Sequence, residues 1–109
     1  MQKAEFIEIL KQLNIPLNEG IQNDKDVHTY PRIVFWDYTW EDVPASDNIY
    51  ITNCTYQVSY FAREPRSKEL IALKHLLNKK GIKLFIQHEY IEREKYFHSF
   101  FSVDLVEDI

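Results

Sequence analysis

The chain has 109 residues, with 13 Lys+Arg against 17 Asp+Glu and a formal net charge of −4 at pH 7. That length suits one domain over residues 1–109, and 45% hydrophobic with 28% charged residues excludes a disordered chain. The acidic excess argues against a nucleic-acid backbone binder. The single cysteine fits a reducing compartment, and no apolar run approaches the roughly 20 residues of a membrane span.

The N-terminal segment is predicted to be a helix over residues 2–13, because Phe6 and Leu10 recur among polar residues at helical spacing. Pro16 follows this helix and favours its end, since the residue before a proline avoids the helical region. Residues 17–29 contain turn formers without a sustained period, so a loop is predicted there.

Two strands and a connecting loop are predicted in the middle of the chain. Aromatic and β-branched residues favour a strand over residues 30–40, while the acids and proline of residues 41–48 predict a loop. Residues 49–61 alternate between polar and apolar types, which predicts a strand with one face on a core. The apolar face consists of Cys54, Tyr56, Val58 and Tyr60.

A leucine-rich helix is predicted over residues 68–80, with Ser67 as its N-cap and Gly81 just beyond its end. A strand over residues 82–91, a turn over 92–94 and a strand over 95–106 complete the chain. The order α-β-β-α-β-β predicts a two-layer α+β fold, in which two helices lie on a mainly antiparallel four-stranded sheet. If both helices share one face, aromatic side chains remain on the other, where we expect a partner.

Patterns typical of catalysis are weak in this sequence. Cys54 lies inside an alternating strand, which favours a packed thiol over a nucleophile. A three-residue turn over residues 92–94 places His88 opposite His98, about 5 Å apart, and such a pair could begin the metal site of a hydrolase. Because no third ligand shares their face, two solvated histidines are the favoured interpretation. We expect no enzyme, with no catalytic residue, cofactor or metal.

The aromatic content is high, with seven Phe, seven Tyr and two Trp, or 15% of the residues. Each large ring buries about 150–250 Å², so a small core cannot easily enclose them all. Some should therefore reach the surface and mark contacts with other chains. Trp36, Tyr38 and Trp40 share one side of the predicted strand, where they are either core residues or anchors of a subunit interface.

Most of the chain, from about Tyr30 to Glu107, has an arrangement found in a known family. The matching segments are YPRIVFW, SDNIYI, TYQVSYFAREPRSKEL, LLNKKGI and EREKYFHSFFSVDLVE. In residue class and order they resemble the small tail-terminator proteins (also called tail-completion or head-to-tail joining proteins) of long-tailed phages and prophages of Gram-positive bacteria.

The resemblance implies a structural virion protein of the phage tail and neck, assembled in the cytoplasm of the bacterial host. Such proteins cap the finished tail tube as a ring, commonly of six subunits, and contact the tail-tube protein and the head-neck connector protein. DNA passes through the ring without specific binding, and an acidic lining would repel it. The candidates for lumen or ring contacts are Asp37, Glu41, Asp42 and Asp47.

A second interpretation, from another class, is a small acidic inhibitor or DNA mimic that binds a host nucleic-acid enzyme. Both interpretations fit a compact acidic chain without catalytic motifs. Oligomeric state distinguishes them, because an inhibitor is expected to be a monomer or dimer and a terminator to assemble as a ring.

Overall fold

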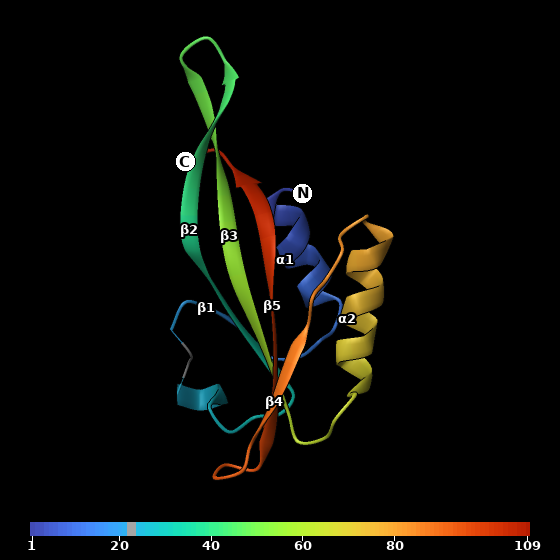
Figure 1. Cartoon of the computed structure of the whole chain (residues 1–109). Helices are drawn as coiled ribbons and strands as arrows, with labels where there is room; N and C mark the ends of the chain where they lie inside the picture. Colours follow the sequence, from blue (N-terminus) through green and yellow to red (C-terminus); the bar gives the residue numbers. More distant parts are fainter. Residues whose placement is uncertain (22–23) are drawn as a thin grey trace.

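The protein is built from a five-stranded mixed sheet with two helices packed on one of its faces (Figure 1). The structure, a computed structural model, describes residues 1–21 and 24–109. The helices are α1 (Lys3–Lys11), α2 (Lys68–Lys79) and the short 3-10 helix η1 (Asp24–Asp26). The strands are β1 (Leu17–Glu19), β2 (Arg32–Ser46), β3 (Ile49–Ala62), β4 (Gln87–Ile91) and β5 (Tyr96–Glu107).

The strands lie in the order β1-β2-β3-β5-β4. β1 is parallel to β2, and the other neighbouring strands are antiparallel. The α+β class with two main helices is therefore confirmed, whereas the predicted four-stranded antiparallel sheet is wrong in detail. The fifth strand, β1, lies within the predicted loop over residues 17–29 and is too short to show a period of its own. Residues 22–23 of that loop lie outside the described residues.

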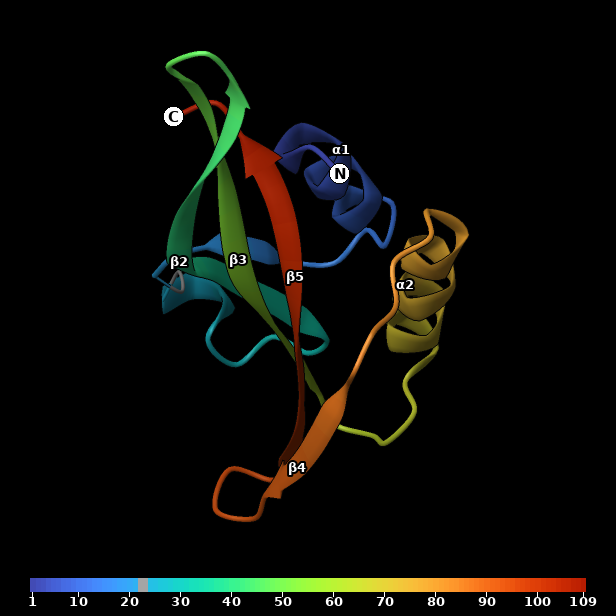
Figure 2. The ribbon, with the colours of Figure 1, turned by 45° about the horizontal axis from the view of Figure 1, so that its top comes forward.

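The apolar face of β3 forms the floor of the core, as its alternation predicted. Both helices pack on this same face (Figures 1 and 2). The buried β3 side chains are Cys54, Tyr56, Val58 and Tyr60. The helices add Phe6, Ile9 and Leu10 from α1 and Leu70, Leu73 and Leu77 from α2, and β5 adds Phe101, Val103 and Leu105.

The ends of α2 lie where they were predicted, but the side chain of the N-cap residue makes different hydrogen bonds from those of a standard N-cap. Ser67 is the N-cap residue, yet its hydroxyl accepts from the Tyr60 hydroxyl and donates to Glu69 (3.1 Å) rather than capping a backbone N–H. The helix is thereby tied to the core face of β3 at its first turn. Gly81 has the predicted left-handed conformation, with φ of 81° just after the helix.

A polar cluster attaches α1 to three strands. Lys3 Nζ donates to Glu19 Oε2 of β1 at 2.6 Å and lies 5.5 Å from the centre of the Tyr56 ring of β3. The Tyr56 hydroxyl donates to Glu107 Oε2 of β5 at 2.8 Å. Burial raises the pKa of Tyr56, so its hydroxyl remains a donor at neutral pH.

The β2–β3 hairpin is longer than the sequence predicted. The predicted loop over residues 41–48 is wrong, because β2 continues to Ser46 and only Asp47 and Asn48 form the turn. Asn48 has a φ of 58°, a conformation that asparagine tolerates well. Pro44 fits inside the strand because β1 pairs only with residues 33–35, which leaves the outer edge of β2 free at Pro44.

The β4–β5 hairpin has a different register from the predicted one. Ile91 pairs with Tyr96, so four residues, not three, connect the strands. His88 consequently faces Ser99, and His98 faces Glu89. The predicted pairing of His88 with His98 is wrong, because a one-residue shift moves each side chain to the other face of a strand.

Truncating the fully buried Leu73 should test the packing of α2 on the sheet. We expect Leu73→Ala to lower the free energy of unfolding by about 2–5 kcal/mol, since it removes apolar contacts and leaves a cavity. Ile71→Ala, on the exposed side of the same helix, should cost under about 1 kcal/mol. Urea denaturation measures both, and equal losses would contradict this orientation of α2.

Candidate functional site

The β2–β3 hairpin is longer than the helices that cover the sheet. β2 has 15 residues, or about 50 Å, whereas α1 and α2 have 9 and 12, together about 30 Å even if laid end to end. The end of the hairpin projects beyond α1 in both ribbon views (Figures 1 and 2). We call residues 40–52 the hairpin arm.

The hairpin arm is exposed on both of its faces from Trp40 to Tyr50, whereas Thr52 at its base is buried. All residues from Tyr38 to Tyr50 are exposed, although a strand beside a core normally buries alternate residues. The exposed fractions are 64% for Trp40, 58% for Ile49 and 57% for Tyr50. Large apolar side chains gathered on one projecting element are typical of a surface that another molecule covers.

A β-bulge divides the aromatic residues of β2 between the two faces of the sheet. The ladder with β3 shifts by one residue at Tyr38, the unpaired residue of the bulge. Trp36 therefore lies on the open face, opposite Gln57, whereas Trp40 lies on the helix side, opposite Cys54. The prediction that Trp36, Tyr38 and Trp40 share one side of the strand is wrong.

Trp36 and Tyr38 form a separate exposed pair on the open face of the sheet. Their exposed fractions are 38% and 53%. The Tyr38 hydroxyl lies 3.0 Å from Ser102 Oγ, so its ring crosses β3 toward β5. Both residues reach the surface, as an interface candidate must, but neither belongs to the hairpin arm.

The four acidic candidates do not form one surface. Asp37 accepts a hydrogen bond from the Trp40 indole N–H, and Asp42 lies on the same helix side of the sheet. Glu41 lies on the opposite side, and Asp47 is in the turn at the tip. The structure therefore places acid on both faces and at the end of the hairpin.

Much of the rest of the open face is filled by the protein's own residues. Arg32 is buried, with its guanidinium 4.6 Å from the Tyr30 ring centre and 4.3 Å from that of Phe61. Tyr96 packs against both rings at 5.7 and 5.5 Å. Sequence reasoning missed this cation–π cluster, because its members come from distant segments.

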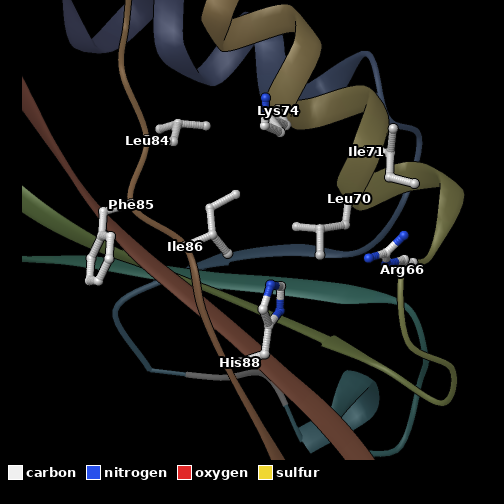
Figure 3. Close-up of a pocket in the computed structure, with 8 residues that line it drawn as sticks. All are labelled: Arg66, Leu70, Ile71, Lys74, Leu84, Phe85, Ile86 and His88. Atoms are coloured by element: carbon white, nitrogen blue, oxygen red, sulfur yellow. The ribbon is translucent and has the colours of Figure 1, made fainter.

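A second surface feature lies between α2 and the segment that leads into β4 (Figure 3). Residues 82–86, predicted as strand, form no ladder and diverge from β5. They leave a cavity of about 610 Å³, which we call the α2 groove. Leu84 and Ile86 point into it, and Leu70 points toward them from α2. Its lining residues are Arg66, Leu70, Ile71, Lys74, Leu84, Phe85, Ile86 and His88.

Charge is segregated between the hairpin and the region of the groove. Residues 33–62 contain four acids and no Lys or Arg, a net charge of −4. Residues 63–95 contain nine Lys+Arg and five Asp+Glu, a net charge of +4. The basic segment is visible in the sequence and could have indicated the region of the groove. Sequence reasoning did not identify it.

His88, His98 and Cys54 each contact other residues of the protein. His88 Nδ1 is 2.7 Å from Ser99 Oγ, and His98, stacked between two phenylalanine rings at 4.7 and 4.9 Å, contacts Glu89 at 3.1 Å. Within residues 1–21 and 24–109, no three or more His, Cys, Asp or Glu side chains are grouped so that they could hold a metal ion. Cys54 is fully buried, and burial, with a smaller contribution from Glu107, raises its pKa to about 12.

No protein-family model matches the chain, and a search of curated proteins also finds no match. Within the described part of the chain, neither helix is long and apolar enough to cross a membrane. The features available for a functional inference are therefore the hairpin arm, the α2 groove and the resemblance in sequence.

The protonated, buried state of Cys54 predicts low reactivity. In the folded protein we expect its thiol to react with an aromatic disulfide reagent only as fast as the protein unfolds, because a thiol with a pKa of about 12 has almost no thiolate at pH 8. In concentrated urea the same thiol should react at once. Absorbance of the released thiolate measures both rates, and rapid labelling without urea would contradict this placement of Cys54.

Proposed function

We propose that this protein is a structural phage protein that caps the end of the tail tube as an oligomeric ring and joins the tail to the head neck. The observation that carries the proposal is the hairpin arm, on which Trp40 and Tyr50 remain more than half exposed in a single chain. The sequence resemblance to tail terminators supports a ring at the end of the tail tube as the assembly that covers this surface. The protein acts by adhesion, without a reaction at an active site.

The surface area of the molecule supports self-assembly. Its accessible surface is 7293 Å², whereas a compact monomer of 13.1 kDa exposes about 6,400 Å². The excess of about 900 Å² is close to the roughly 800 Å² that each partner contributes to a standard interface. The radius of gyration, 15.0 Å against about 13 Å expected, reflects the same elongation.

The acidic residues support a role beside DNA in transit. At −4 per copy, a ring of six copies carries a net charge of about −24. Carboxylates that face the channel repel the phosphate backbone and keep DNA moving. Because Glu41 and Asp42 lie on opposite faces of the hairpin, one set of acids can line the lumen while another contacts a neighbouring copy.

Capping of tail tubes is the direct test of this function. We expect the purified protein to appear by electron microscopy as a ring at the ends of tubes made from the tail-tube protein of the same genome. A Trp40→Ser/Tyr50→Ser variant should keep its unfolding midpoint within a few degrees yet lose capping, because it removes exposed anchors rather than core. Tyr90→Ser, an exposed aromatic residue on β4, is the matched control and should still cap.

The alternative function has a distinct outcome in the same experiment. A protein that ignores tail tubes at every concentration, and instead forms a stoichiometric complex with a host nucleic-acid enzyme, is an inhibitor or DNA mimic. That result would remove the tail-terminator proposal.

Neutralising the acids should separate their role in assembly from any role in folding. The variant carries Asp37→Asn, Glu41→Gln, Asp42→Asn and Asp47→Asn. We expect little change in melting temperature, since these groups form no ion pair among the described residues, but weaker ring assembly and a lower phage titre. Calorimetry, light scattering and plaque counts measure the three effects. Unchanged assembly and titre would show that the acids have no such role.

A further inference from the structure

We infer that the hairpin arm of one copy docks into the α2 groove of the next copy, so that the subunits join head to tail. This inference rests on the proposed function, and it names the two surfaces that meet at each contact between subunits of the ring. The occupant of the groove is a second copy of this chain, through the helix-side face of its arm.

The arm cannot fill the groove of its own chain. In both ribbon views the arm leaves the body beyond α1, at the end opposite the β4–β5 turn, whereas the groove lies beside α2 (Figures 1 and 2). The molecule is 52 Å long and only 29 and 22 Å in its other dimensions. An arm held away from the body in this way is positioned to reach a neighbour.

The apolar groups of the two surfaces are complementary. Trp40, Pro44 and Tyr50 project from the helix side of the arm, since Trp40 lies opposite the inward-facing Cys54 and the ladder alternates from there. The groove presents apolar side chains from both of its walls and has a volume of about 610 Å³. An exposed aromatic ring entering an apolar pocket is the common form of an interface hot spot.

The charges of the two surfaces are complementary as well. Asp42 lies within the apolar face of the arm, between the ladder positions of Trp40 and Pro44. At the groove, Lys74 Nζ donates to the neutral Asn78 at 2.8 Å, and neither Lys74 nor Arg66 is paired with an acid within the described ranges. Docking brings Asp42 to these two cations.

The same charges exclude the symmetric contacts. Two arms facing each other bring together three acids from each copy, a net charge of −3 per arm, and two grooves bring together Arg66 and Lys74 of each copy. Like charges juxtaposed at an interface are costly, so the arm-to-groove contact is favoured over both. A contact between different surfaces of identical subunits is heterologous, and it generates a closed ring when the rotation per subunit allows closure.

Disulfide cross-linking between copies tests the contact. One variant carries Tyr50→Cys on the arm and the other Ile71→Cys, at a position 43% exposed in the groove. The natural Cys54 is buried and does not compete. We expect the mixture, alone or on tail tubes, to give about tenfold more cross-linked dimer than either variant by itself. A mixture of Tyr50→Cys with Tyr90→Cys, outside the groove, is the control.

A mixing experiment checks the head-to-tail direction. The arm variant Trp40→Ser/Tyr50→Ser keeps its groove, and the groove variant Ile71→Asp/Lys74→Glu keeps its arm. Each should fail to form rings, and their mixture should stop at a dimer of one copy each, because only one productive contact remains. Circular dichroism confirms that both variants are folded, and light scattering gives the mass.

The outcomes separate this inference from the proposed function. Rings that cap tubes without the Tyr50→Cys to Ile71→Cys cross-link overturn the arm-to-groove contact and leave the function standing. Cross-linked copies that never cap a tube support the contact and overturn the tail-terminator function. Protein that neither cross-links nor caps overturns both.

Discussion

The mismatch in length between the central hairpin and its covering helices determines the shape of this protein. A strand gains about 3.3 Å per residue and a helix only about 1.5 Å, so the two short helices, even laid end to end, span little more than half the length of β2. Where they lie, apolar residues of β3 are buried. Where they end, the same hairpin continues with both faces in solvent, and that uncovered part is the surface from which function is inferred.

One continuous strand, β3, connects the core to the arm. Cys54 through Tyr60 anchor the strand under α1 and α2, and β5 stays paired with it as far as Thr52. Only the end of the arm is therefore two-stranded, which is marginally stable by itself. In the proposed ring a neighbouring copy would stabilise that end, while the buried part of β3 holds its direction relative to the body.

The elements that sequence reasoning predicted well are those with a strong local period. The leucines of α2 and the alternation of β3 each face the core, as predicted, and Gly81 follows α2 in the left-handed conformation. The predicted loop over residues 41–48 failed because an arm exposed on both faces shows no alternation and tolerates acids and a proline. The signal of periodicity exists only where one face is buried.

The sequence by itself determined the α+β class, the core faces of α2 and β3, the surplus of aromatic residues and the separation of acidic from basic segments. Only the tertiary structure decided three features. These are the bulge that puts Trp36 and Trp40 on opposite faces of the sheet, the register in which His88 and His98 are not paired, and the groove beside α2. The physical reason is that period and charge are properties of neighbours along the chain. Register and cavities depend on how many residues each turn holds and on which distant segments meet.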